Sequence, residues 1–285
     1  MAEFESKRLC RVALLPDCHV QSGRCTWPTQ PTRRLYGAAR DLLESCLNRL
    51  EQMNVDAALL LGDTLDPADS QGLDWLSSLI ETRPFAVYTI IGNHESYGSL
   101  SISEFHRRLE MPASGNYVVR VNEVPFVMLA TPDQDGFSNG SSEFAWLRNT
   151  LEQLSDVPNV FCCAHFSLVV HPCVQGARND GMQVLWSAAS LLDLLDEFPN
   201  VRGWIAGHKN IPSKVEERGV LHLLSPQLIQ APCAFRVLDI FSNGIVSKLY
   251  EIEEKELAEL SRQAYGTEYV ERLGRPEDRD FSWFW

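Results

Sequence analysis

Five short apolar segments of this chain each lead into residues that commonly bind metal ions. Asp17-Cys18-His19 follows residues 12–16, Gly62-Asp63 follows 57–61, Gly92-Asn93-His94-Glu95 follows 85–91, His165 lies near the end of 159–166, and Gly207-His208-Lys209-Asn210 follows 201–206. Short apolar runs that alternate with amphipathic helical patterns predict buried strands. In open α/β sheets, chemistry collects beyond the carboxyl ends of the strands. The pattern therefore predicts an α/β fold with its site at such an edge.

The rest of the chain supplies both strands and helices. Helical patterns cover 32–53, 73–81, 141–154, 182–198 and 251–264, a hairpin is expected over 116–130, and further strands over 220–224, 235–241 and 245–250. No internal repeat or linker divides the sequence. We therefore expect one domain over 1–285 with two sheets in the middle and helices outside. Residues 251–285 are expected to form a C-terminal helix and an aromatic tail, both of which pack on the rest of this domain.

Composition excludes some classes of partner. The chain has 285 residues, 45% of them hydrophobic, and a formal net charge of −13 without a cluster of basic residues. A nucleic-acid polymer is therefore not an expected partner, because its phosphates require a basic surface. A membrane-spanning helix is not expected, because the sequence has no run of 18 apolar residues. Scattered cysteines without a secretory signal favour a cytoplasmic protein, and the aromatic tail leaves a homo-oligomer possible.

The residue types at the strand ends suit borderline divalent ions. Carboxylate, imidazole and amide groups together favour Mn or Fe, with Zn also possible. Alternation along the strand is expected to place Asp17 and His19 on one side and Cys18 on the other, so that Asp17 and His19 can hold one ion together. Asp63 has two carboxylate oxygens and can bridge two ions.

These motifs together resemble the signature of the calcineurin-like metallophosphoesterase superfamily. The ordered match, D-x-H, G-D, G-N-H-[DE], a single His and G-H-x-x, covers residues 12–210. Residues 141–154 and the following strand are also similar to the cyclic-nucleotide phosphodiesterase-like branch. The resemblance implies a four-layer α/β/β/α sandwich. It also implies a phosphoester hydrolase that uses two divalent or trivalent metal ions to activate water against a small phosphodiester, such as a cyclic nucleotide.

The resemblance implies a role for each motif residue. The first metal would be held by Asp17, His19 and Asp63, and the second by Asp63, Asn93, His165 and His208. His94 would not bind metal, but would lie beside the substrate phosphoryl group and either stabilise its charge or protonate the leaving oxygen. Asn93 would contact the substrate as well, and Asp63 counts with His94 as catalytic.

The last motif departs from the family pattern. Its usual form, G-H-x-H, ends in a histidine that completes the first metal site, whereas this chain has Asn210. An amide oxygen binds Mn, Fe or Zn more weakly than imidazole does, so we expect a first metal that is bound more loosely, is a different ion, or is recruited together with the substrate. Lys209 could contact phosphate, but a solvated lysine is the expected state. Arg178 is the only cation of the loop 171–183 and a candidate to bind a substrate phosphate.

Several alternatives stay open on the sequence alone. The acidic residues Asp66, Glu95 and Asp133 could orient metal ligands or could simply be solvated. His171 is expected to be structural, although it could line the pocket. A phosphomonoesterase or a nucleotide pyrophosphatase would use the same ligands, and a non-catalytic binding module could keep the fold. The presence of His94 beside the complete remaining motifs favours an enzyme.

Overall fold

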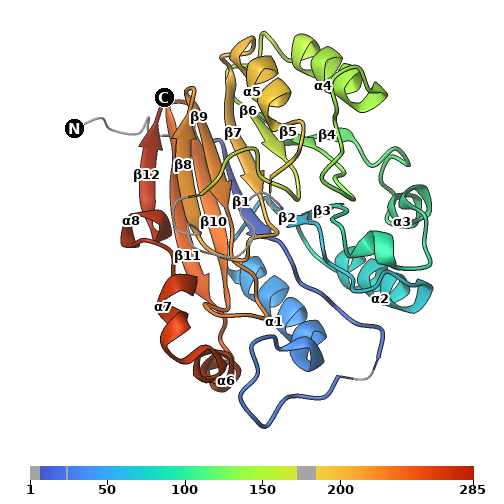
Figure 1. The fold of residues 1–285 in the computed structure, drawn as a ribbon, viewed down its shortest axis with the longest axis vertical. Coiled ribbons are helices and arrows are strands. Elements are labelled where there is room, and N and C mark those ends of the chain that lie inside the picture. Colours follow the sequence, from blue (N-terminus) through green and yellow to red (C-terminus); the bar gives the residue numbers. More distant parts are fainter. Residues whose placement is uncertain (1–6, 24, 172–183) are drawn as a thin grey trace.

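The computed structural model describes residues 7–23, 25–171 and 184–285, which form two six-stranded sheets (Figure 1). The first sheet has the order β12-β11-β10-β1-β2-β3, and the second has the order β4-β5-β6-β7-β9-β8. The strands of the first sheet are β1 (Cys10–Leu15), β2 (Ala57–Leu61), β3 (Ala86–Ile90), β10 (Ala234–Phe241), β11 (Gly244–Glu251) and β12 (Phe281–Phe284). Those of the second are β4 (Tyr117–Val121), β5 (Val124–Met128), β6 (Val160–Cys163), β7 (Val201–Ala206), β8 (Ser213–Glu217) and β9 (Val220–Leu224).

Both sheets contain a parallel core of strands. In the first sheet β1, β2 and β3 are parallel neighbours. In the second sheet β5, β6, β7 and β9 are parallel neighbours. Parallel strands end at the same edge of a sheet, so the motifs that follow β1, β2, β3, β6 and β7 are brought together by the topology.

Central strands such as β2 and β6 are apolar along their whole length because both of their faces are buried. In β1, Val12 and Leu14 pack in the core between the sheets, whereas Ala13 and Leu15 pack toward the outer helices. All four side chains are at most 1% exposed. The two-residue period of a strand therefore distributes its side chains between two separate cores.

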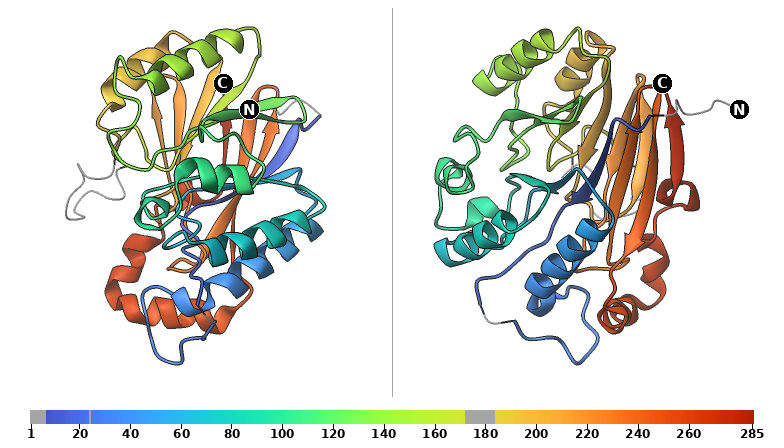
Figure 2. Two further views of the ribbon diagram at one scale, coloured as in Figure 1. Left: turned by 90° about the vertical axis from the view of Figure 1, so that its right-hand side faces the viewer. Right: turned by 180° about the vertical axis from the view of Figure 1, so that it is seen from behind.

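Helices cover the outer faces of both sheets. They are α1 (Ala39–Gln52), α2 (Ser70–Glu81), α3 (Ile102–Arg108), α4 (Ser142–Gln153), α5 (Ala188–Asp196), α6 (Lys255–Tyr265), α7 (Tyr269–Arg272) and α8 (Pro276–Arg279). Leu43 and Leu47 of α1 pack on the first sheet, and Leu147 of α4 and Leu191 of α5 pack on the second. Figure 2 shows α1 and α4 on opposite sides of the strands. The α/β/β/α arrangement is as expected.

Some predicted elements were wrong in detail. The helix expected over 32–53 begins at Ala39, because the preceding chain runs beside residues 229–230, where the Leu35 amide donates to the Ile229 carbonyl at 2.7 Å. The helix expected over 182–198 is described only as α5. Neither α3 nor β8 was predicted, since their short sequences have weak periodicity.

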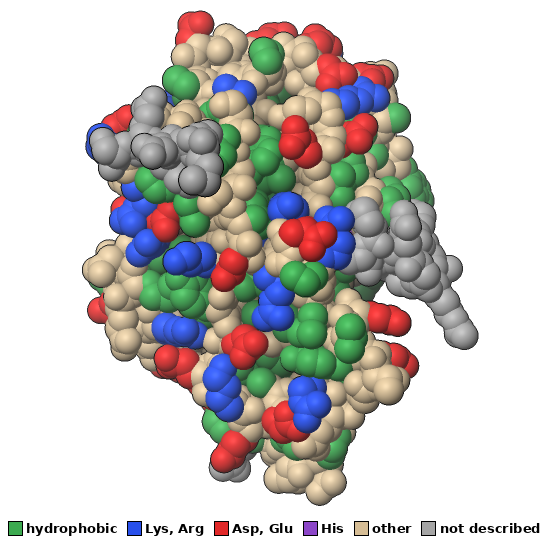
Figure 3. All heavy atoms as spheres, turned by 90° about the vertical axis from the view of Figure 1, so that its left-hand side faces the viewer, with side chains coloured by type: hydrophobic (Ala, Val, Ile, Leu, Met, Phe, Trp, Pro, Cys, Tyr) green, Lys and Arg blue, Asp and Glu red, His purple; other side chains and the backbone are tan. Residues whose placement is uncertain are grey.

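The surface that lies on the left of Figure 1 is formed by the C-terminal part of the chain. There β12 pairs antiparallel with β11, and the Trp285 ring nitrogen donates to the Ser242 carbonyl at 3.1 Å. Figure 3 shows basic and acidic side chains interspersed on this face. Within the described ranges, no helix combines the length and apolar character that crossing a bilayer requires.

Candidate metal centre

Side chains that follow five different strands converge at the common edge of the two sheets. Three groups place their ligand atoms within 4.8 Å of one another: Asp17, His19 and Asp63; Asp63, His165 and His208; and His19, Asp66 and His94. Asp63 belongs to the first two groups, which is the position expected of a residue shared by two ions. These side chains come from segments that are far apart in the sequence, and their convergence supports the interpretation of this region as a metal site.

The backbone turns sharply where these side chains leave the strands. Left-handed φ angles occur at Asp17 (55°), His19 (46°), Asp63 (53°), His208 (65°) and Asn210 (61°). Residues other than glycine pay a conformational cost there, and such residues concentrate at functional sites. The strained turns aim successive side chains at one point.

Asp17 and His19 reach the same site, but not for the reason expected. The strand β1 ends at Leu15, so simple alternation does not place these two side chains. Their left-handed turns do so, bringing Asp17 Oδ1 to 3.8 Å from His19 Nε2. Cys18 between them is buried in the core under the helices, as expected.

Asp63 occupies the middle of the site. Its Oδ1 accepts a 2.8 Å hydrogen bond from the His94 amide, and its Oδ2 lies 3.1 Å from His165 Nε2. Burial raises the pKa of Asp63, but the hydrogen bond from His165 and the charges of His165, His19 and His94 together lower the pKa below its ordinary value. Asp63 is therefore held as a buried carboxylate at the point that both groups share.

A glycine before Asp63 makes this close packing possible. Gly62 has a φ of +85°, and a Cβ atom at this position would lie 2.7 Å from His165 Nδ1 and 2.8 Å from the Gly92 amide nitrogen. Any larger residue would therefore push two motifs apart. Glycine at position 62 therefore allows both the left-handed turn and the close approach of the chain to His165 and Gly92.

The histidines are oriented by hydrogen bonds to one ring nitrogen. His165 Nδ1 lies 2.8 Å from the Leu61 carbonyl, so this nitrogen donates and Nε2 points toward Asp63 and the His208 ring. His19 Nδ1 lies 3.0 Å from Asp66 Oδ2, and its buried Nε2 has no hydrogen-bond partner among the described residues. A ring held at one nitrogen with the other nitrogen left for a cation is the usual state of a metal-binding histidine.

Two asparagine side chains each present a buried oxygen. Asn93 Nδ2 donates to the Tyr97 hydroxyl at 3.2 Å, and Asn210 Nδ2 donates to the His208 carbonyl at 2.8 Å. Their Oδ1 atoms are buried and have no hydrogen-bond partner within the described ranges. Leaving such an oxygen unsatisfied is costly, and a bound cation would satisfy it. The donor set of the site therefore fits metal ions.

Asp66 links two of the histidines and is not simply solvated. Its Oδ2 lies 3.0 Å from His19 Nδ1, and its Oδ1 lies 2.9 Å from His94 Nδ1. Burial raises the pKa of Asp66, but its hydrogen bonds to the two histidines lower the pKa below its ordinary value. One carboxylate thus fixes the rings of a candidate metal ligand and of the candidate catalytic residue.

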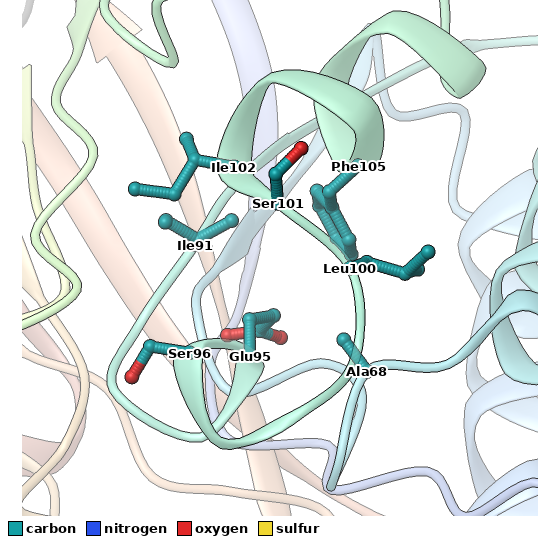
Figure 4. A pocket seen from close by; sticks show the side chains of 8 residues that line it. All are labelled: Ala68, Ile91, Glu95, Ser96, Leu100, Ser101, Ile102 and Phe105. Carbon is teal, nitrogen blue, oxygen red and sulfur yellow. The ribbon is translucent and has the colours of Figure 1, made fainter.

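Glu95 holds the loops underneath the site. Its carboxylate accepts backbone hydrogen bonds of 2.6–3.0 Å from Asp63, Thr64, Leu65 and Gly92. Figure 4 shows it among side chains that include Ala68, Ile91 and Phe105. Burial, with a smaller contribution from Asp63, raises the pKa of Glu95 to about 7. The third acidic candidate, Asp133, is exposed and accepts from the amide of Asp135 in its own loop.

One basic residue of the last loops differs from expectation, one agrees with it, and a third lies outside the described residues. Lys209 is only 6% exposed, so the prediction of a solvated lysine was wrong. His171 is structural, with Nδ1 3.0 Å from the Ser213 hydroxyl. Arg178 lies outside the described residues.

The sequence analysis missed two residues that border the site. Arg34 and Tyr36 lie just before α1, and the Tyr36 ring meets the His19 ring edge to face at 5.9 Å between centroids. Neither belongs to a recognisable motif. Only the proximity of this loop to the end of β1 in the folded chain brings them to the site.

The match to known families agrees with this geometry. The family model described as calcineurin-like phosphoesterase matches residues 10–212, a range that holds every candidate ligand. The chain belongs to the calcineurin-like phosphoesterase family. As a member, it is a metal-dependent phosphoester hydrolase, and its two groups of ligand-type side chains around Asp63 fit a dinuclear centre.

Solved structures show the same fold at low sequence identity. A dimetal phosphatase of Danio rerio is similar over 85% of this chain and 96% of its own, with a TM-score of 0.67 and 18% identity. A purple acid phosphatase from yellow lupin (Lupinus luteus) seeds matches 85% of this chain and 51% of its own, at 0.58 and 15%. An anchor of the Plasmodium inner membrane complex matches 96% of both chains, at 0.57 and 14%. No curated protein sequence matches the chain significantly.

Proposed function

We propose that this phosphoesterase hydrolyses small phosphodiesters, with a cyclic or other small nucleotide as the substrate class. The observation that carries the proposal is an exposed aromatic ring beside the candidate proton donor. Tyr97 is 66% exposed, and its ring centroid lies 5.1 Å from that of His94. A base or other aromatic group attached to the phosphoryl group can stack on this ring, because aromatic faces bind bases without needing specific hydrogen bonds.

The proposed ligands divide into two sets that share one carboxylate. The first ion would be held by Asp17, His19, Asp63 and Asn210, and the second by Asp63, Asn93, His165 and His208. Oxygen and nitrogen donors of this kind favour Mn or Fe. When bound, two such ions lower the pKa of a water molecule and stabilise the charge of the phosphoryl group.

His94 is proposed to supply the proton for the leaving oxygen. Its side chain is 26% exposed, and its Nδ1 is fixed at 2.9 Å from Asp66 Oδ1. Burial lowers the pKa of His94, but the hydrogen bond to Asp66 and the charge of Asp63 raise it above the ordinary value. The raised pKa favours the protonated form of the ring, from which a proton could pass to the leaving ester oxygen.

The function is tested by comparing two esters with the same leaving group. We expect the Mn-loaded protein to hydrolyse bis-p-nitrophenyl phosphate with a kcat/KM at least tenfold above that for p-nitrophenyl phosphate. A small cyclic nucleotide should also be a substrate. The opposite preference would indicate a phosphomonoesterase, cleavage of nucleotide pyrophosphates alone would indicate a pyrophosphatase, and either result would reject the proposal.

Replacing Asn210 with histidine is expected to tighten binding of the first ion. The buried Oδ1 of Asn210 is the weakest donor of its set, and imidazole binds Mn, Fe and Zn better than an amide does. We expect the dissociation constant of the weaker Mn ion to fall about 10-fold, within the roughly 10–100-fold range known for changes around metal sites. Calorimetric titration of Mn into the apoprotein measures it, with Asn200→His as a control away from the site. Equal affinities for the Asn210 variant and the wild type would show that residue 210 does not contact the ion.

A further inference from the structure

One guanidinium group beside the metal centre has no part in the ligand sets. Arg34 Cζ lies 5.8 Å from the centre of the Tyr36 ring, which in turn meets the His19 ring at 5.9 Å. Arg34 is near enough to the centre for charge interactions to reach Asp17 and His94, and they contribute to the pKa of Arg34 and of His94. A fixed positive charge thus borders the side where His19 and His94 lie.

The guanidinium is held in place, and part of it stays available. Arg34 Nε donates to Gln230 Oε1 at 2.9 Å, and Nη1 donates to the Tyr36 hydroxyl at 2.7 Å. Gln230 is itself fixed by a 3.0 Å hydrogen bond from Gln227. An arginine has five N–H donors, so the remaining ones, those of Nη2 included, have no partner among the described residues. Such a half-buried, preorganised fork suits an oxyanion.

Electrostatics favour an anion at this position. If two metal ions occupied the proposed sites, they would repel the Arg34 guanidinium, and negative charge between them would offset that repulsion. The carboxylates of the site are already engaged with histidines and backbone amides. A phosphoryl group brought by the substrate would supply the missing charge. This negative charge would be in place once the metal ions and the substrate are both bound.

Two neighbouring arginines differ from Arg34 in this respect. Arg272 donates to the backbone carbonyl of Asn210 at 2.7 Å and so supports the last motif. Arg33 is exposed, forms a 2.7 Å ion pair with Glu268 and lies 4.7 Å over the Tyr265 ring. Of these three, Arg34 is the one whose neighbour Tyr36 meets the His19 ring and whose Nη2 has no hydrogen-bond partner within the described residues.

We propose that Arg34 is a substrate-positioning residue that binds a phosphoryl oxygen of the substrate at the metal centre. The inference rests on the proposed function only in taking a phosphoester as the substrate. It applies equally to a diester and to a monoester, because both carry a nonbridging anionic oxygen. Tyr36 and Gln230 would act by holding the guanidinium rather than by touching the substrate.

The test measures binding of inorganic phosphate to the Mn-loaded full chain by calorimetry. Arg34→Ala is expected to raise the dissociation constant of phosphate about 10- to 100-fold, the range of one charge-assisted hydrogen-bonded contact. Arg34→Lys keeps the charge but loses the two-pronged guanidinium, so its dissociation constant for phosphate should lie between those of Arg34→Ala and the wild type. Arg33→Ala, the neighbouring exposed arginine, should stay within twofold of the wild type.

Metal content separates a substrate contact from a structural role. Mn bound per chain should be equal in the wild type and in all three variants. Loss of Mn from both Arg34 variants would overturn the inference, because it would show that Arg34 supports the ligands. Unchanged phosphate affinity in Arg34→Ala, or a wild type that does not bind phosphate, would overturn it too. A wild type that binds phosphate but cleaves neither ester would reject the proposed function while leaving the Arg34 result in force.

Discussion

Replacing Asp63 with asparagine should lower kcat/KM for bis-p-nitrophenyl phosphate by at least about 10³-fold. Asp63 is the side chain common to both proposed ligand sets, with one oxygen at 3.1 Å from His165 and the other on the His94 amide. Loss of outer-sphere partners alone typically costs roughly 10–100-fold, and a shared direct ligand should cost more. The substitution also removes the negative charge that two adjacent cations require. Steady-state kinetics and Mn analysis after dialysis measure the two effects.

The loss of Asp63 should show in metal content as well as in rate. We expect fewer than two Mn ions per chain in Asp63→Asn, whereas the exposed residue Asp156, changed in the same way, should keep both ions and full activity. Full Mn occupancy with near-normal turnover in Asp63→Asn would mean that this carboxylate does not join the two sites, and the dinuclear assignment would have to be abandoned.

Replacing His94 with alanine should lower kcat about 10²- to 10⁴-fold without releasing Mn. This range is typical of a positioned proton donor or acceptor. His94 contacts Asp66 rather than the centre of the ligand sets, and its Nε2 lies 3.9 Å from Asp63 Oδ2. A variant that loses turnover but keeps its Mn would distinguish His94 from the proposed metal ligands His19, His165 and His208. Kinetics and Mn analysis on one preparation provide both numbers.

The leaving group separates the two roles open to His94. If His94 protonates the leaving oxygen, its removal should cost much more with a nucleoside leaving group than with p-nitrophenolate, which departs without a proton. Equal losses with both would assign it to stabilising the phosphoryl charge instead. Loss of Mn from His94→Ala would make it a ligand and contradict both roles.

The sequence by itself determined the layered fold and the residues that meet at the site. Short apolar runs such as 57–61, which lead directly into glycine and polar residues, predict strands buried on both faces, and parallel strands end at one edge, so the motifs that follow them were expected to converge. The metal chemistry followed from carboxylate, imidazole and amide side chains at those ends. These features depend on local periodicity and residue type, which any reader of the chain can see.

Only the tertiary structure decided how the site is held and which further side chains border it. The left-handed turns at Asp17 and His19, the Asp66 carboxylate shared by two histidines, and the approach of Arg34 depend on contacts between segments far apart in the chain. The amide of His208 donates to Asp17 across 191 positions at 2.8 Å, and no local pattern encodes such a contact. The expected reason for the positions of Asp17 and His19, strand alternation, was wrong because β1 ends before these residues. Beyond the end of β1, contacts with distant segments determine the backbone conformation, and the two-residue period of a strand no longer applies.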